Sequence, residues 1–500
     1  ALTRLEAAKL LTVNRDAASA LVSLDAHPLL REYFARQLRG QYPDAWHAAH
    51  RRLYEYLCAS TPDKPQPTLE DLQPLYQAVA HACKAGLQEE ACDVYDNTIL
   101  QHREQYSLKK LGVFGSDLGA LACFFDQPWK SVSPSLTEAD QAFLMNQTFM
   151  CLRALGRLTE APEPMRVATN WAAKEKDWEH AAIGASNLSE LELTLGEVAG
   201  AAGAVGHAEQ SVTYADRSGG AFWKLASPTS HADALHQAGR RAEAETLFRE
   251  AEQMQAESYP NYPLLDSVQG FRYCDLLLAA PERAAWRESM KDEGRRTKEE
   301  LLAACRAVSQ RAAQTLKWAT GNFGLLDVAL NHLTLGRAAL YAAILEGRDG
   351  ALRRPRADAA RNRTATDEFE TARRELAAAV DGLRRANRSD YLPRGLLTRA
   401  WLRFLTGART ESTSSTQTGP ESAQEDLDEA REIAERGPMK LFLADIHLYR
   451  ARLFGRETLY PWESPHADLA EARRLIEKCG YGRRKEELED AEAGLRQQYS

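Results

Sequence analysis

The feature that most constrains this chain is a pattern of glycine, alanine and apolar residues that recurs three times. In each copy a Gly lies five residues before an Ala, an apolar residue follows four residues later, and a small residue follows three residues after that. The copies are Gly156–Ala161–Met165–Ala168, Gly196–Ala201–Val205–Ala208 and Gly239–Ala244–Phe248–Ala251. Spacings of three and four residues place side chains on one helical face, and the Gly allows a turn before that helix. The pattern therefore predicts stacked pairs of helices.

The remainder of the chain also favours helices. Ala, Leu, Glu and Arg dominate the sequence, and apolar residues recur at helical spacing almost everywhere. We expect an all-α fold with at most one short β element, at residues 20–24. A helix through Leu2, Leu5, Leu10 and Leu11 precedes this element, and a helix over residues 29–38 follows it. Helix, short hairpin and helix is the order in which a winged-helix domain ends.

The Gly–Ala–Phe–Ala pattern resembles the tetratricopeptide (TPR) repeat. Its glycines lie 40 and 43 residues apart, against about 34 in the standard repeat, so longer helices or loops must absorb the excess. The resemblance implies a TPR-like α-solenoid, a right-handed superhelix whose concave surface is lined by the first helix of each pair. The repeat register places six polar residues on that inner wall, where each is either a recognition residue or ordinary solvated surface. They are Asn146, Arg153, Ser186, Glu190, Asp233 and His236.

Three segments are predicted to lie outside the packed array. An Arg-rich stretch at residues 347–363 and a Ser/Thr-rich stretch at residues 412–419 have few apolar residues, so we expect mobile loops there. The charged segment 483–498 is typical of a solvated capping helix.

Charge and cysteine content exclude several classes of protein. The 63 Lys and Arg against 71 Asp and Glu give a net charge of −8, which disfavours broad capture of nucleic acid or of an anionic membrane. The longest clean apolar stretches are far shorter than the 18 or so residues that cross a bilayer. No two of the eight cysteines form a CxxC pair, so they are interpreted as reduced thiols, and we expect a cytoplasmic protein.

Catalytic motifs are missing from the sequence. It has no GxxxxGK[ST] phosphate loop, no HExxH, no GxSxG and no carboxylate-rich metal loop. His47 and His50 lie near one helix face and are either a metal pair or packing residues, and packing is favoured because no third ligand is evident. We therefore expect no enzyme activity, no metal and no cofactor in this region.

The segment 24–34, LDAHPLLREYF, resembles the end of the winged-helix domain in STAND NTPases, the signalling ATPases that include NB-ARC and NACHT proteins. A Met-His-Asp motif lies here in that family, and its His contacts the bound ADP. His27 is the one position that carries over, since Ala26 and Pro28 replace the other two. His27 is therefore either an ADP contact or a cap of the following helix.

Five further stretches resemble bacterial STAND proteins with TPR C-termini: residues 50–57, 187–191, 270–277, 436–439 and 444–452. The resemblance implies three regions: the C-terminal part of a winged helix at 1–40, a helical connector at 41–135, and a TPR-like sensor domain at 136–500. An NTPase core that binds ADP or ATP with Mg, and an effector domain, are expected outside this sequence.

The function that the resemblance implies is that of a sensor arm. The arm binds a protein or peptide trigger, phage-derived if the output is antiviral defence, on its concave face and controls ATPase-driven oligomerisation of the full-length protein. Its partners are that trigger and its own NTPase core, and we expect neither a membrane nor nucleic acid. The alternatives are the sensor arm of a STAND-type transcription regulator and a passive TPR scaffold.

The chain by itself should not hydrolyse ATP. It lacks a phosphate loop, and His27 alone cannot hold a triphosphate and magnesium. Phosphate release from the purified chain is the measurement that checks this. Turnover that a substitution within the chain abolishes would contradict it.

Overall fold

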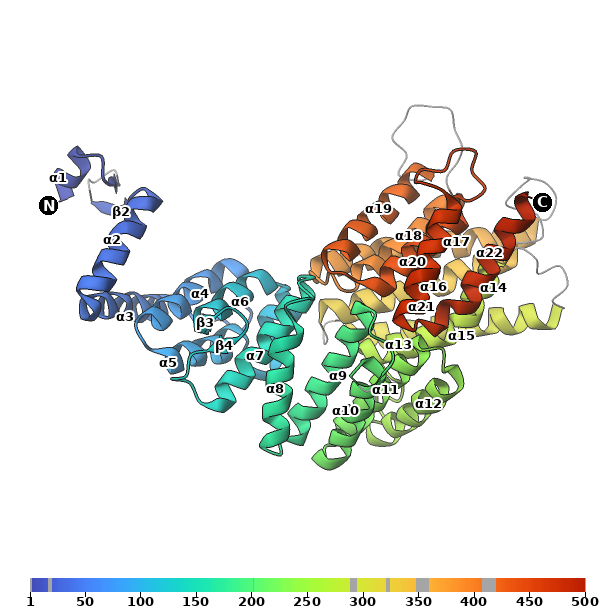
Figure 1. Cartoon of the computed structure of the whole chain (residues 1–500), viewed down its shortest axis with the longest axis horizontal. Coiled ribbons are helices and arrows are strands. Elements are labelled where there is room, and N and C mark those ends of the chain that lie inside the picture. Colours follow the sequence, from blue (N-terminus) through green and yellow to red (C-terminus); the bar gives the residue numbers. More distant parts are fainter. Residues whose placement is uncertain are drawn as a thin grey trace. The chain divides into compact units, whose positions relative to one another are not determined.

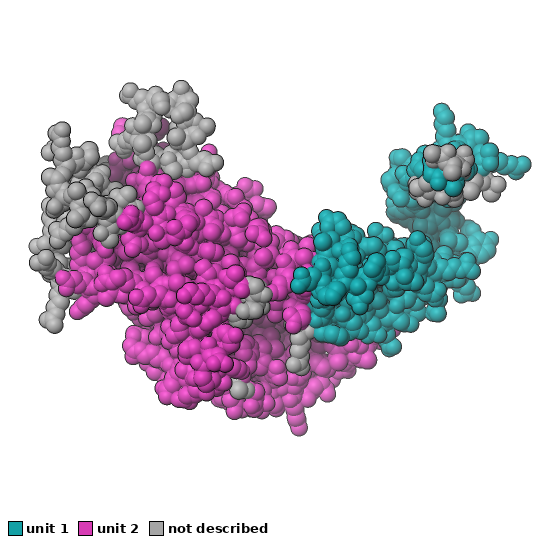
Figure 2. All heavy atoms as spheres, turned by 180° about the vertical axis from the view of Figure 1, so that it is seen from behind, with its two compact units in different colours: residues 1–102 teal, residues 103–500 magenta. Residues whose placement is uncertain are grey.

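A computed structural model describes residues 2–499, except 17–19, 201, 288–294, 321–323, 348–358 and 407–419. The chain divides into two compact units, residues 1–102 and 103–500 (Figure 2). The structure confirms an all-α, solenoid-like fold with very few strands. The domain boundaries expected at residues 40 and 135 stay predictions.

The first unit begins with a helix, a β-hairpin and a second helix, in the predicted order, but the first helix ends at Ala7, so its predicted extension through Leu10 and Leu11 is wrong. These elements are α1 (Leu2–Ala7), β1 (Thr12–Arg15), β2 (Leu21–Asp25) and α2 (Pro28–Gln41) (Figure 1). The strands pair antiparallel, with Val13 opposite Leu24. Helix α2 has no buried residue and exposes Leu29, Tyr33 and Phe34, so it presents an apolar face to solvent.

The rest of the first unit packs around helix α4. Its elements are α3 (Pro43–Ser60), α4 (Leu69–Lys84), α5 (Gln88–Asp93) and the π-helical η1 (Val94–Ile99). Thr68 and Asp71 form a capping box that starts α4, because each side chain accepts a hydrogen bond from the backbone amide of the other. Val79 of α4 and Tyr95 of η1 are fully buried in this core.

The second unit enters through short elements. They are η2 (His102–Glu104), which starts at the unit boundary, η3 (Ser107–Leu111), α6 (Phe114–Leu121), η4 (Ala122–Phe124), β3 (Phe125–Gln127) and β4 (Ser131–Val132). The β3–β4 pair is a second two-stranded sheet, so the expectation of at most one β element is wrong. These strands are two and three residues long, too short for a periodic signal.

Helix pairs then continue to the C-terminus. The inner helices are α7 (Glu138–Ala154), α9 (Trp178–Leu195), α11 (Ala221–Gln237), α13 (Ser267–Leu277), α16 (Leu325–Gly347), α18 (Leu392–Thr406) and α20 (Lys440–Phe454). The outer helices are α8 (Pro162–Lys174), α10 (Ala204–Ser218), α12 (Arg241–Ser258), α15 (Arg295–Ala319), α17 (Ala359–Arg385), α19 (Pro420–Arg436) and α21 (Pro465–Cys479). The short α14 (Ala279–Trp286) follows α13, and η5 (Gly482–Arg484) and α22 (Lys485–Tyr499) end the chain.

The inner helices from α9 to α20 form a closed ring. Helix α9 packs against α11, and the contacts continue in order through α13, α16 and α18 to α20. Helix α20 then packs against α9, so the ring closes on its first helix. The sequence predicted a concave surface, and the closure converts it into the interior of a ring.

The ring closes along a line of turns that we call the seam, where the turns after α7, α9 and α11 meet those before α18, α20 and η5. The Ser389 amide donates to the Ala154 carbonyl at 2.9 Å. Gly239 has φ +85°, and a Cβ on Gly482 would lie 2.2 Å from the Ala238 carbonyl oxygen. Glycine is therefore needed on both sides of this approach. Gly156 and Gly196 also have positive φ, which confirms the predicted turns.

Three other expectations have different outcomes. The Ser/Thr-rich stretch 412–419 lies outside the described residues. So do residues 348–358 of the Arg-rich stretch 347–363, whose last residues belong to α17, which begins at Ala359. The solvated capping helix is wrong at its start, because Arg484 and Glu487 are buried. Among the described helices, α16 alone is long and apolar enough to cross a membrane. Of the 18-residue apolar stretch in this helix, 83% is buried within the chain. Its apolar residues are explained by its place in the ring.

Phe248 is predicted to be a stability centre of the third repeat. Its side chain is fully buried beside Ala244 and Ala251 and stacks on Tyr273 with the ring centroids 5.0 Å apart. Replacing Phe248 with Ala should cost about 3–5 kcal/mol of unfolding free energy, because such a change leaves a cavity. Denaturant unfolding measures the loss, and hydrogen exchange should show it across residues 230–260.

The control is Glu245→Ala on the same helix. Glu245 pairs with Arg249 one turn on at a partly exposed position, so its removal should cost only a few tenths of a kcal/mol. Unchanged protection across residues 230–260 in Phe248→Ala would show that the repeat register is wrong.

Candidate functional site

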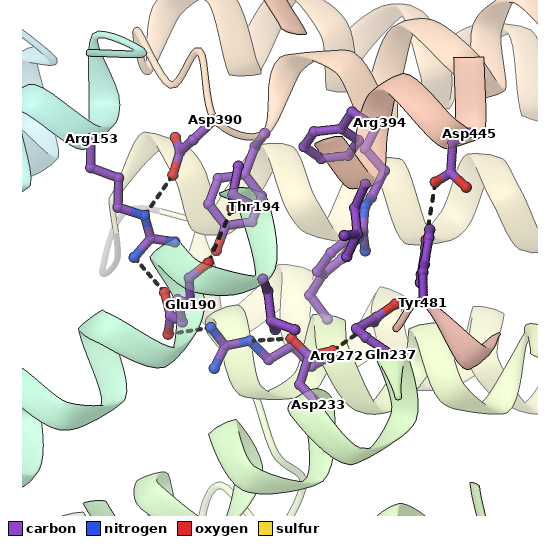
Figure 3. A pocket seen from close by; sticks show the side chains of 15 residues that line it. Arg153, Glu190, Thr194, Asp233, Gln237, Arg272, Asp390, Arg394, Asp445 and Tyr481 are labelled. Carbon is purple, nitrogen blue, oxygen red and sulfur yellow. Dashed lines mark hydrogen bonds and ion pairs between the residues drawn. The ribbon is translucent and has the colours of Figure 1, made fainter. Parts of the chain in front are cut away.

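A pocket lies inside the ring, against the seam. Its cavity volume is about 70 Å³, well below the roughly 300–1,000 Å³ of small-ligand sites, so a ligand larger than a few water molecules must widen it. The lining side chains come from α7, α9, α11, α13, the start of α18, α20 and the turn before η5 (Figure 3). The charged and polar ones are Arg153, Glu190, Thr194, Asp233, Gln237, Arg272, Asp390, Arg394, Asp445 and Tyr481, and the others are Leu193, Phe271, Tyr391, Leu441 and Phe442.

On one side of the pocket, arginines and carboxylates alternate. Arg153 bonds Glu190 at 2.5 Å, and its Nε lies 3.0 Å from Asp390. Arg272 pairs with the same Glu190, and its Nε lies 3.4 Å from Asp233 (Figure 3). This chain of ion pairs joins α7, α9, α11 and α13 to the turn before α18.

Behind the pocket, one carboxylate is shared among three arginines. Asp275 of α13 lies 2.7 Å from Arg337 of α16 and 3.4 Å from Arg394 of α18, and it is hydrogen-bonded to Arg483 of η5. Asp275 and two of these arginines are almost fully buried, whereas the Arg394 side chain is 27% exposed. The inner helices and the C-terminal segment therefore converge on this carboxylate.

A second shared carboxylate extends the cluster to α14 and α20. Glu282 of α14 accepts from Arg337 at 3.2 Å, from Arg483 at 3.1 Å and from Arg484 at 3.0 Å. Arg484 also donates to Asp445 of α20 at 2.8 Å. Segments about 200 residues apart in sequence are thus joined by buried charges.

The arginines lower the pKa values of Glu190, Asp275 and Glu282. Burial alone would raise the pKa of Glu190, but Arg272 and Arg153 lower it to about 2. Burial likewise opposes Arg484 and Arg337 at Glu282, whose pKa is also lowered to about 2. Asp233 differs, since burial raises its pKa despite Arg272. It shares Arg272 with Glu190 and is therefore less fully paired.

The six predicted inner-wall residues divide by position. Arg153, Glu190 and Asp233 line the pocket together. Ser186 is buried and lies with its Oγ 2.7 Å from Ser230 Oγ, outside the lining. His236 is buried with Nε2 4.0 Å from Asp275, and burial together with Arg483 holds its pKa well below 6.5. Asn146 is partly exposed and does not line this pocket.

Several site residues were missed by sequence reasoning. Arg272 and Asp275 lie three residues apart in FRYCDLLL, an otherwise apolar helix, and that contrast could have indicated buried charges. Arg394 had no such signal, because the partners of α18 come from distant parts of the chain. Arg483 and Arg484 lie in a strongly charged segment, which concealed their burial.

The histidines noted in the first unit have structural partners. His27 caps α2, and its Nδ1 accepts from the Leu29 amide at 3.3 Å, while its predicted ADP contact stays a prediction. His50 Nδ1 lies 2.8 Å from Nδ1 of His81 on α4, and burial and His81 lower the pKa of His50 to about 4. This contact fits the packing interpretation. No group of three or more potential metal ligands occurs among the described residues.

Fold and site together define an all-α, solenoid-like protein with a charged interior pocket. No protein-family model matches the chain, and no curated protein matches it. The pocket carboxylates Glu190, Asp390 and Asp445 are held by guanidinium groups.

The ion pairs predict a loss of stability in acid. Glu190 releases its proton near pH 2 in the folded protein and near pH 4.5 when unfolded, so the unfolded state binds more protons between these values. The free energy of unfolding should therefore fall as the pH drops from about 4.5 towards 2, by about 3 kcal/mol from this group. Denaturant unfolding at a series of pH values measures the slope.

Glu190→Gln should weaken this dependence. At neutral pH it should also cost about 3–5 kcal/mol, because Arg153 and Arg272 lose a buried partner. The exposed Glu370 pairs only with Arg373 one turn on, so Glu370→Gln should leave both stability and slope near wild type. Equal slopes in wild type and Glu190→Gln would contradict the assignment.

Proposed function

We propose that this chain is the sensor arm of a signalling NTPase of the STAND class, and that its trigger binds in the interior pocket. The observation that carries the proposal is the position of the pocket, which is lined from both sides of the seam. A ligand there contacts the early helices α7, α9 and α11 and the late helices α18 and α20 at once. Binding can therefore change how the ring closes.

The energetic requirement on such a trigger is specific. It must bind one arrangement of the ring more tightly than the other, because a ligand with equal affinity for both shifts nothing. The ion pairs Arg153–Asp390 and Arg272–Asp233 lie where a polar trigger would compete for partners. This competition provides the difference in affinity.

The first unit offers a surface for the NTPase core. Helix α2 exposes Leu29, Tyr33 and Phe34, and Tyr42 follows at its end. Several exposed large apolar residues on one helix are characteristic of a protein–protein contact. We propose that the NTPase core, with its ADP or ATP and Mg, packs on this face, that the full-length protein oligomerises on activation, and that the output is defence against phage.

A pocket-filling substitution tests where the trigger binds. Thr194 lines the pocket and its hydroxyl donates to the Glu190 carbonyl at 3.1 Å. Thr194→Trp should abolish capture of a trigger from extracts of phage-infected cells, because the indole occupies the pocket. Thr246 makes the same kind of bond, to the Ala242 carbonyl at 3.1 Å, on an exposed helical face, so Thr246→Trp is the matched control.

Binding of the same protein by wild type and by both variants would contradict binding at the pocket. Hydrogen exchange then distinguishes a sensor from a passive scaffold. A sensor should change protection on both sides of the seam, at residues 154–157 and 385–391, when the captured protein is added. Unchanged exchange at both segments would support the scaffold.

A further inference from the structure

The charges around the pocket do not cancel. Arg153, Arg272 and Arg388 face Glu190, Asp233 and Asp390, three against three. The second cluster is different, because five arginines face four carboxylates among the described residues. The arginines are Arg337, Arg394, Arg452, Arg483 and Arg484, and the acids are Asp275, Glu282, Asp445 and Glu487. His236 adds no charge at neutral pH because its pKa is well below 6.5.

Arg394 is the least fully paired arginine of the second cluster. Arg452 is 6% exposed and donates to both the carboxylate and the carbonyl of Glu487. Arg394 has one ion pair, 3.4 Å from Asp275, and that carboxylate is already held by Arg337 and Arg483. Its side chain is 27% exposed and lines the pocket. Arg394 is therefore the cation with capacity for a further anion.

The surroundings of Arg394 are aromatic. Its guanidinium carbon lies 5.5 Å from the ring centroid of Phe271 and 5.7 Å from that of Phe442. Two rings hold the planar group by cation–π contacts while one of its terminal nitrogens faces Asp275 at 3.4 Å. Leu193, Leu441 and Tyr391 add apolar surface to a lining that is otherwise mostly charged and polar. A matching ligand has one anionic group and an apolar body.

We propose that the pocket binds a carboxylate that carries an apolar or aromatic group, with the carboxylate on Arg394. The planar fork of Arg matches a carboxylate with two parallel hydrogen bonds. One surplus positive charge matches a monoanion, whereas a phosphate dianion would leave negative charge beside Asp275 and Asp445. Two sources supply this chemistry, the C-terminus of a protein and a free small acid. The inference rests on the proposed function, since it names the chemistry of the trigger at the same pocket.

Calorimetric titration of the whole chain with four probes tests the ligand class. The probes are N-acetyl-phenylalanine, its uncharged amide, a pentapeptide ending in Phe with a free carboxylate, and inorganic phosphate. Both carboxylates should bind at least about tenfold more tightly than the amide, which is the scale of a charge-assisted hydrogen bond. Tighter binding of the peptide indicates a protein C-terminus, and equal binding indicates a free acid. Equal binding of acid and amide, preference for phosphate, or no binding of either acid at millimolar concentration would overturn the proposal.

Variants on helix α18 locate the carboxylate. Arg394→Gln should weaken binding of the acid at least about tenfold and leave the amide unchanged, while Asp275 keeps Arg337 and Arg483. Arg394→Lys keeps the charge but not the planar fork, so its affinity for the acid should lie between those of wild type and Arg394→Gln. Arg403→Gln is the control, because Arg403 is 21% exposed on the same helix and its partner Asp426 keeps Arg399. Equal acid affinity in Arg394→Gln and wild type would refute the role of Arg394.

The two proposals fail in different ways. A captured trigger that needs an open pocket but is bound equally by Arg394→Gln would refute the carboxylate and leave the sensor in place. Acid binding that depends on Arg394, without any change in exchange across the seam, would support the ligand class and refute the sensor.

Discussion

One buried carboxylate holds the second unit together. Asp275 of α13 meets Arg337 of α16, Arg394 of α18 and Arg483 of η5. A buried charge is tolerated only when its partners are in place, and removing one side exposes the other to a large desolvation penalty. Arg483 lies 208 residues further along the chain, so the C-terminal segment must return to α13 before this ion pair can form. The charges thus link the two ends of the array more specifically than apolar contact alone.

Apolar packing provides most of the buried surface between the early and the late helices. A single cluster of buried residues joins Leu193 and Ala208 of the early helices to Leu448, Leu475 and Leu488 of the late ones. Such burial is favourable but does not fix register, because similar side chains can slide past one another. Ion pairs and close glycine turns do fix it. The ring is therefore closed by apolar packing, which stabilises the contact, and by ion pairs and glycine turns, which fix its register.

The elements were predictable from the sequence, whereas their closure was not. Gly156, Gly196 and Gly239 mark turns through local geometry, and Phe248 lies in the core because helical spacing places it there. Local periodicity, however, does not predict which turns, far apart in the sequence, are in contact with each other. For that reason Arg153, Glu190 and Asp233 could be placed on an inner wall, while Arg394 and Arg483 could not be paired with them. Closure also explains why Ser186 and His236, assigned to the same wall, lie buried behind the pocket lining.

Closure also restricts how a protein of this kind can change its length. An open array can gain or lose a repeat at either end, since each unit contacts only its neighbours. In a ring where α20 must meet α9, one more or one fewer pair would misalign every turn along the seam, from Ala154–Ser389 to Gly239–Gly482. Proteins with this architecture therefore cannot diversify by duplicating whole repeats. Insertions are tolerated only in the loops between helices, because the length of a loop does not change which turns meet along the seam.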